Sequence, residues 1–93
     1  MREIRRTTAF KRDYKREKRG PHGKGLDELL GATILALAND RPLQSARRDH
    51  PLLGVWSGFR DCHLKPDLML LYSKPDAATL ALVRLGSHRE LFE

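Results

Sequence analysis

The fold of this chain is decided by residues 49–72, which read DHPLLGVWSGFRDCHLKPDLMLLY. Residues 55–64 are predicted to form a strand that glycine weakens locally. Residues 68–73, LMLLYS, are apolar on both faces, as is typical of a central strand. The turn between these strands is short, so we expect them to pair antiparallel. A third strand is predicted at residues 79–85, TLALVRL, after a second short turn.

The first part of the chain is predicted to hold one weak strand and one basic helix. Residues 2–8 form a candidate edge strand, because Ile4 is their only strongly apolar side chain. A helix is expected at residues 9–19, where Phe10 and Tyr14 lie four positions apart and mark the stripe to be buried. Most other positions of this helix are Lys or Arg, so its outer face is strongly basic.

A second helix is predicted at residues 26–38, because leucine and isoleucine recur there at helical spacing. Glycine and proline in residues 20–23 separate the helices and predict an antiparallel helical hairpin. Residues 87–92 are expected to form a short helical turn. We therefore predict one α+β domain over residues 1–93. It has two N-terminal helices packed on a small antiparallel sheet, in the order β-α-α-β-β-β.

Composition narrows the compartment and the partners. The sequence has one cysteine, no signal-peptide pattern and no apolar run long enough to cross a bilayer, so we expect a cytoplasmic protein. The net charge of +6 is uneven: residues 1–24 carry ten Lys or Arg against three Asp or Glu, and residues 25–93 carry eight against nine. Such a basic segment attracts polyanions. The alternative interpretation is a solvated, partly frayed N-terminus.

Five titratable side chains near the later strands are candidates for chemistry: His50, Asp61, His63, Asp67 and His88. Asp61 and His63 lie two positions apart on a predicted strand and share a face. His50 and His88 lie in connecting segments, where functional residues concentrate. Histidines gathered in one cleft supply a general base, a general acid and positive charge. Cleavage of RNA by its own 2′-hydroxyl needs these three functions.

Other interpretations of these residues stay open. Three histidines and two aspartates also suit a metal site, although the sequence has no HExxH, no CxxC and no histidine pair at helical spacing. Cys62 alternates with the polar residues of its strand, so it is expected to point into the core. Trp56 and Phe59 are expected to pack in the core rather than to stack on bases. Arg60 and Arg84 suit either a phosphate or a carboxylate within the sheet.

From about Ile4 to Phe92, and most strongly from Asp49 onward, the chain resembles the YafQ family of bacterial type II toxin–antitoxin toxins, in the RelE/ParE superfamily. The resemblance rests on fixed spacings: Asp49-His50-Pro51-Leu52, Gly54, Trp56, Gly58, Arg60-Asp61, His63, Pro66-Asp67, Leu70, Tyr72, Arg84, Gly86, His88 and Leu91-Phe92. It implies a RelE-like, microbial-RNase-like fold and ribosome-dependent endoribonuclease activity on messenger RNA in the decoding site, with no metal or other cofactor. It also implies control by a RelB/DinJ-like antitoxin, through which alone the toxin meets operator DNA.

The resemblance also implies residue roles. It gives a catalytic set of four residues: His50, His63, Asp67 and His88. We expect His88 to act as a general acid or base, with His50 or His63 as its counterpart. Three further residues are expected to support the site or to stack on RNA: Asp61, Phe92 and Arg60. The cations of the first helix are expected to bind ribosomal RNA: Lys11, Arg12, Lys15, Arg16, Lys18 and Arg19.

Three rival functions follow from the same sequence. One is ribosome-independent cleavage of free RNA. A second is a ParE-like poison of DNA gyrase, which needs no histidine cluster and is therefore disfavoured by the three histidines. The third is a plain binding module that associates with the ribosome or with operator DNA.

Overall fold

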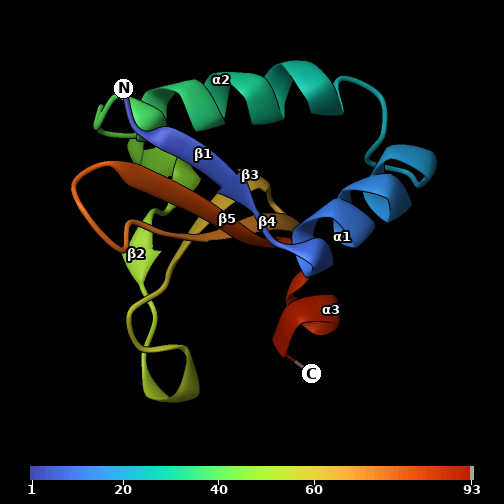
Figure 1. Ribbon diagram of the computed structural model, residues 1–93. Coiled ribbons are helices and arrows are strands. Elements are labelled where there is room, and N and C mark those ends of the chain that lie inside the picture. Colours follow the sequence, from blue (N-terminus) through green and yellow to red (C-terminus); the bar gives the residue numbers. More distant parts are fainter. Residues whose placement is uncertain (93) are drawn as a thin grey trace.

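The chain folds into a single five-stranded sheet with two helices packed on one face and a short C-terminal helix on the other (Figure 1). The structure is a computed structural model, and it describes residues 1–92. Its elements are β1 (Glu3–Arg6), α1 (Thr8–Arg19), α2 (Leu26–Ala38), β2 (His50–Pro51), β3 (Arg60–Lys65), β4 (Leu68–Ser73), β5 (Thr79–Gly86) and α3 (His88–Phe92). Two single-turn 3-10 helices lie at Ser45–Arg47 and Gly54–Trp56. Among the described helices, none is long and apolar enough to span a membrane.

The sheet is mixed rather than purely antiparallel, which corrects the prediction. Its strand order is β1-β5-β4-β3-β2, and β1 runs parallel to β5 while the other neighbours run antiparallel. The parallel pair arises because α1 and α2 intervene between β1 and the strands that follow, so that a tight hairpin cannot join β1 to its partner. The predicted α+β class and the order of the main elements are confirmed.

The segment before β3 also differs from the prediction. The strand expected at residues 55–64 begins only at Arg60, and a 3-10 turn occupies Gly54–Trp56. Gly54 and Gly58 adopt φ of 67° and 94°, a left-handed backbone that interrupts a strand and that glycine tolerates best. The loop is preceded by β2, a two-residue strand that pairs with the start of β3 and that sequence periodicity did not indicate.

The main core lies between the helices and one face of the sheet. Leu26, Leu30 and Leu37 of α2 pack with Phe10 of α1 against inward-facing leucines of β3, β4 and β5. Cys62 belongs to this core and is fully buried, as predicted, and burial raises the pKa of its thiol to about 12. A second, smaller cluster lies on the opposite face of the sheet, where Met69 and Leu71 of β4 pack beneath α3. On β3, likewise, alternate side chains point to opposite faces of the sheet, and Cys62 and Leu64 point into the main core.

Helix α1 buries carboxylates as well as an aromatic ring, which the sequence analysis missed. Its buried residues are Phe10, Asp13 and Glu17, whereas the predicted stripe residue Tyr14 is only partly buried. Thr7, just before the first residue of the helix, is its N-cap: its hydroxyl accepts a hydrogen bond from the Phe10 amide at 2.9 Å. The same hydroxyl donates to the carbonyl of Val83 in β5 at 2.7 Å.

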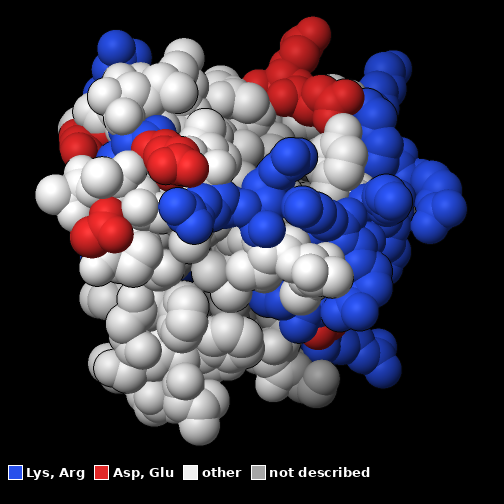
Figure 2. All heavy atoms as spheres, viewed as in Figure 1, with Lys and Arg blue, Asp and Glu red and all other residues white. Residues whose placement is uncertain are grey.

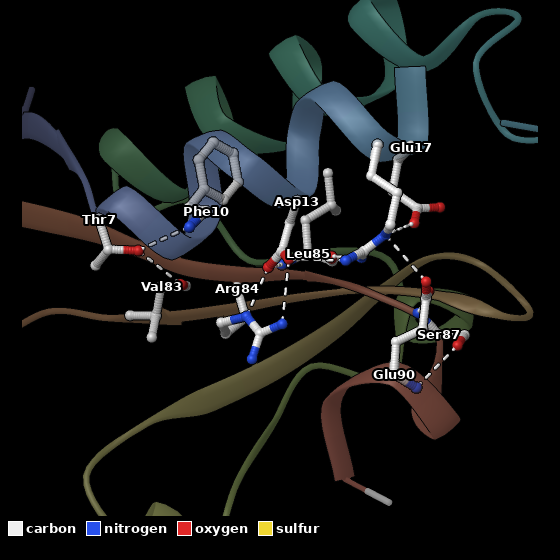
Figure 3. A network of polar contacts seen from close by, with 10 residues as sticks. Thr7, Phe10, Asp13, Glu17, Val83, Arg84, Leu85, Ser87 and Glu90 are labelled. Carbon is white, nitrogen blue, oxygen red and sulfur yellow. Dashed lines mark hydrogen bonds and ion pairs between the residues drawn. The ribbon is translucent and has the colours of Figure 1, made fainter. Parts of the chain in front are cut away.

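A polar network joins α1 to the end of β5 (Figure 3). The Asp13 carboxylate accepts hydrogen bonds from Arg84 at 2.6 and 3.1 Å, from the Leu85 amide at 3.1 Å and from Arg16 at 3.0 Å. Burial by itself raises the pKa of Asp13, but the hydrogen bonds from Arg84 and Leu85 outweigh it and the pKa is lowered. The carboxylate is therefore buried in ionised form with its acceptor positions filled.

Replacing Asp13 by Asn should destabilise the fold by about 2–3 kcal/mol, because it leaves the partly buried Arg84 guanidinium without its counter-charge. The lowered pKa means that wild type holds this advantage above the unfolded pKa of about 3.9 and loses it as the pH falls through the folded value. Urea unfolding at pH 7 and pH 3 should therefore show a gap that shrinks in acid. Asp40→Asn, at an exposed carboxylate with two cation partners, is the matched control and should change little. An equal effect of the two variants would contradict the buried role of Asp13.

Candidate functional site

A shallow depression of about 450 Å³ lies on the sheet face opposite α1 and α2. His50 from β2, His63 from β3 and His88 from α3 line it together with Asp61. Apolar side chains complete its wall: Leu52, Leu53, Trp56, Pro66, Met69 and Phe92. The three histidines predicted from sequence, which are up to 38 positions apart in the chain, therefore surround one space.

The short strand β2 fixes His50. His50 pairs with Asp61 across the β2–β3 ladder, and its Nε2 lies 3.9 Å from Asp61 Oδ2. The other ring nitrogen, Nδ1, lies 2.6 Å from the carbonyl oxygen of Arg48. A carbonyl only accepts, so Nδ1 carries a proton and donates. In the neutral ring Nε2 then has the free lone pair, directed to the side where Asp61 lies.

Helix α3 holds His88 at the other side of the depression. The Ser87 hydroxyl accepts from the Glu90 amide at 3.1 Å, and the Glu90 carboxylate accepts from the Ser87 amide at 2.9 Å, so the two residues form a capping box. Glu90 also pairs with Arg16 of α1 at 3.0 Å (Figure 3). On the exposed side the His88 ring lies 5.2 Å from the ring of Phe92, measured between centroids. These contacts fix a helix of only five residues.

Asp61 is the most unusual group of the site. It is 3% exposed, and within the described part of the chain its Oδ1 atom has no hydrogen-bond partner. Burial raises its pKa, while His63, His50 and His88 act in the opposite direction when they are charged. A buried carboxyl oxygen without a partner costs free energy, so this atom is an acceptor that the resting fold leaves unsatisfied.

Two residues of the predicted set lie elsewhere. Asp67 is exposed in the turn between β3 and β4 and does not line the depression, although its neighbour Pro66 does. Arg60 makes a pair with Asp49 at 3.2 Å and lies 3.3 Å from the Tyr72 hydroxyl. Arg84 is bound to Asp13. Each of these arginines thus pairs with a carboxylate, as one of the two interpretations expected, but the carboxylates lie on α1 and in the segment before β2 rather than within the sheet.

The basic face of α1 is separate from the depression. Lys and Arg side chains gather over α1 at the right of Figure 2, away from the white surface at the lower left. Of the six predicted cations, four are exposed and make no ion pair within the described residues: Lys11, Arg12, Lys15 and Arg19. Arg16 is bound into the network of Asp13, Glu17 and Glu90, and Lys18 pairs with Asp27 at 2.7 Å.

Sequence reasoning missed the residues that hold the histidines in place. Asp13, Arg16 and Glu90 connect α1 to α3, and Tyr72 donates to Asp49 at 2.6 Å beside β2. Burial, followed by the Asp49 contact, raises the pKa of Tyr72. Only the Ser87–Glu90 spacing carries a readable signal, since S-x-x-E is the sequence signature of a capping box.

The residues of the depression do not form a ready metal site. Among residues 1–92 no group of three or more His, Cys, Asp or Glu side chains is arranged to hold a metal ion.

Comparison with known proteins gives a consistent match. The model of the family described as "Bacterial toxin of type II toxin-antitoxin system, YafQ" matches residues 2–93. The mRNA interferase toxin YafQ of Escherichia coli (strain B / BL21-DE3) is 34% identical over 92 residues, which cover 99% of this chain and 97% of that protein. The crystal structure of YafQ from E. coli strain BL21(DE3) is similar over the full length of both chains, with a TM-score of 0.88 and 31% identity.

Two further solved structures bear on partners and ligands. A structure of the E. coli DinJ–YafQ complex matches all of both chains with a TM-score of 0.80 and 34% identity. A copper-bound mutant toxin from Helicobacter pylori matches 99% of this chain and 100% of its own, with a TM-score of 0.87 and 37% identity.

Replacing Asp61 by Asn should leave the free energy of unfolding at pH 7 unchanged or raise it. Burial raises the pKa of Asp61 in the folded protein. Compared with this variant, wild type is therefore most stable below the unfolded pKa of about 3.9. Its relative stability falls as the pH rises through the folded pKa, because the buried carboxyl group must then ionise. Urea titrations between pH 4 and pH 8 measure the trend. Asp67→Asn, the same change at an exposed site, should run parallel to wild type. A variant of Asp61 that is clearly destabilised at pH 7 would show that the histidines hold the carboxylate ionised.

Proposed function

The chain belongs to the YafQ family of type II toxin–antitoxin toxins, and from that membership we propose that it is an mRNA interferase, a toxin that inhibits translation by cutting messenger RNA. One observation carries the proposal beyond the family. Three histidines from three separate elements surround one depression with a buried carboxyl group. These side chains can donate and accept the protons that cleavage of a phosphodiester requires.

The proposed reaction is attack of the RNA 2′-oxygen on the adjacent phosphorus. A base removes the 2′ proton, the bond between the 2′-oxygen and phosphorus forms, and the bond from phosphorus to the 5′-oxygen breaks. The departing 5′-oxygen takes a proton from an acid, and the products are a 2′,3′-cyclic phosphate and a 5′-hydroxyl. The step involves no oxidation or reduction. One side chain that accepts a proton and one that donates a proton are therefore enough to balance it.

The geometry suggests a division of roles among the histidines. His50 is suited to be the base, because its Nδ1 is committed to the Arg48 carbonyl and its Nε2 is left to accept the 2′ proton. His88, across the depression, is then the acid that protonates the 5′-oxygen. His63 lies between them on β3 and supplies positive charge to the phosphorane oxygens.

The two aspartates have different proposed tasks. Asp61 stabilises whichever imidazole becomes protonated during the reaction, since its Oδ1 atom is buried and free to accept. Asp67 stands at the rim, next to Pro66, and is suited to contact the RNA chain rather than to transfer a proton. Phe92, which packs against His88 and Trp56, offers a ring on which a base can stack.

We propose that cleavage takes place on the ribosome. The exposed cations Lys11, Arg12, Lys15 and Arg19 form a basic face on α1, remote from the histidines, that suits ribosomal RNA. The message then enters the depression while the basic face contacts the particle. Direct cleavage of free RNA is the rival, and omission of ribosomes from the assay separates the two.

We also propose that a cognate DinJ-like antitoxin neutralises the toxin. A groove of about 640 Å³ runs between β1, α1 and α2, with Phe10, Leu30 and Ile34 among its apolar residues. Arg6, Lys11 and Lys15 are the cations among the groove's lining residues. An amphipathic segment with acidic side chains fits such a groove, and its binding would cover part of the basic face. Contact with operator DNA is then left to the antitoxin.

Cleavage is tested with purified toxin, programmed ribosomes and mapping of the RNA ends. Wild type should cut the message and leave a 2′,3′-cyclic phosphate. His50→Ala and His88→Ala should each slow cleavage by about 100-fold or more, the usual loss of a general acid or base. His22→Ala is the matched control, because His22 lies in the turn between α1 and α2 and should not alter the rate. An intact message with wild type, or equal rates for His22→Ala and His88→Ala, would remove the proposal.

The need for a metal is tested in the same assay. Toxin treated with a chelator and dialysed before it meets the ribosomes should keep its full rate. A rate that falls and returns on addition of copper would assign the reaction to a metal-dependent mechanism.

Antitoxin binding is tested by reversing charge at the groove. Lys11→Glu with Lys15→Glu should weaken binding of a DinJ-like antitoxin by at least about tenfold, because acidic side chains then face like charge. Both residues are exposed, so folding should not change. The control is Arg5→Glu with Arg41→Glu, which makes the same charge change outside the groove. Unchanged affinity, measured by calorimetry, would place the antitoxin on another surface.

A further inference from the structure

A second groove adjoins the histidine depression and is not used by the proposed chemistry. It has a volume of about 550 Å³ and is lined by Arg47, Arg48 and Lys65 beside the polar side chain of Gln44. His63 and Pro66 line both the groove and the depression, so the two spaces adjoin at these residues. We propose that this groove binds a backbone phosphate of the RNA nucleotide next to the scissile phosphate. The inference rests on the proposed function and adds a subsite to it.

The wall of the groove is built from cations held in place by the fold. Arg47 ends the 3-10 helix Ser45–Arg47 and donates from Nη1 to the carbonyl of Leu64 at 2.8 Å. One nitrogen of the guanidinium is thereby fixed to β3, and the others stay available as donors. Lys65 lies at the end of β3, and its ammonium is 3.4 Å from the carbonyl of His22. Both side chains are half-buried rather than extended into water.

Arg48 connects the groove to the histidine site through its backbone. It adopts φ 51° and ψ 42°, a left-handed conformation in which arginine is uncommon. Its amide donates to the carbonyl of Ser45, and its own carbonyl accepts from His50 Nδ1 at 2.6 Å. The residue that sets the tautomer of the proposed base thus carries one of the groove's cations. Strained backbone of this kind is concentrated at functional sites.

The charge of the groove is uncompensated. Across the described residues, Arg47, Arg48 and Lys65 take part in no ion pair, and no carboxylate lines the groove. By contrast Arg2, Arg16 and Lys74 each meet a carboxylate within 3.0 Å. Three cations that the fold leaves unpaired in a concave surface raise the local concentration of anions.

The position of the groove selects the kind of anion. The groove shares a wall with the depression that is proposed to hold the scissile phosphate, and a nucleic acid strand presents another phosphate at every nucleotide. A strand that leaves the depression past His63 therefore brings its neighbouring phosphate to Arg47, Arg48 and Lys65. Guanidinium and ammonium groups are the usual partners of phosphate oxygens.

The test measures affinity for an RNA that the toxin cannot cut. The probe is a fluorescent single-stranded RNA dodecamer with 2′-O-methyl groups, which lack the attacking hydroxyl. The variant is Arg48→Gln with Lys65→Gln, and it spares Arg47 because that residue supports β3. The control is Arg5→Gln with Arg41→Gln, which removes two exposed cations elsewhere. Anisotropy titrations at several salt concentrations give the dissociation constant and its salt dependence.

The proposal expects the groove variant to bind about tenfold more weakly than the control at 0.1 M salt. It also expects a shallower plot of log affinity against log salt, by about 0.7 for each lost phosphate contact. Equal affinity and slope for the two variants would overturn it, as would wild type that does not bind the RNA. Loss of antitoxin binding with unchanged RNA affinity would show a protein-binding surface instead.

The outcome is independent of the cleavage assay. If wild type binds through the groove but leaves a message on ribosomes intact, the proposed function fails and the phosphate subsite stands. If wild type cuts the message and the groove variant binds like the control, the function stands and the subsite is wrong.

Discussion

The carboxylate of Asp13 is the constraint on which the rest of this structure depends. It is buried on α1, yet it receives hydrogen bonds from Arg84, Arg16 and the Leu85 amide at the end of β5. Arg16 continues the chain of contacts to Glu90, which caps α3 together with Ser87. Because His88 begins that helix, the position of one imidazole in the site depends on an ion network on the other side of the sheet. A glycine at position 86 permits this crossing, since a Cβ atom there would lie 2.9 Å from Arg16 Nη2 and 3.2 Å from Glu90 Oε1.

One face of the sheet carries the main hydrophobic core, and the other face carries the residues of the proposed site. On β3 the residues Cys62 and Leu64 point to the helices and are buried in the main core, while Asp61 and His63 point to the opposite face. That opposite face has only a small apolar cluster and the five residues of α3 to cover it. A sheet covered on one side by two long helices is stable enough to leave the other side largely open to a ligand. The basic face of α1 lies on the outer surface of the helical layer, so attraction to a polyanion does not disturb the histidines.

Much of this arrangement was predictable from the sequence, and the exceptions have physical causes. The helix at residues 26–38 and the strands at 68–73 and 79–85 follow from periodicity, and the inward direction of Cys62 follows from alternation. The parallel pairing of β1 was missed, because a four-residue strand with no buried residue carries no signal of its neighbour. The burial of Asp13 and Glu17 was missed because charged residues on a basic helix are expected in water. The strand residues that compensate the buried Asp13 carboxylate, Arg84 and the Leu85 amide, lie 71 and 72 positions away in the sequence. Asp67 was grouped with the histidines by its place near the later strands and by the family resemblance, and the structure places it in an exposed turn, outside the residues that line the depression.

The protein has two almost fully buried aspartates among its described residues, and the contrast between them is the clearest sign that the depression is more than a packing defect. Asp13 and Asp61 are both almost fully buried, and folding has supplied the first with four hydrogen bonds while the second keeps an oxygen with none inside the described chain. A purely structural carboxyl group in the second position would be replaced without loss by an apolar side chain, since leaving it unpaired costs stability. Its surroundings point to another reason for its presence. Three histidines from three elements line the depression with it, and each of them, when charged, favours the ionised form of its carboxyl group. An acceptor that the resting fold leaves unsatisfied is consistent with the proposed role of Asp61, in which it interacts with an imidazole that becomes protonated during the reaction.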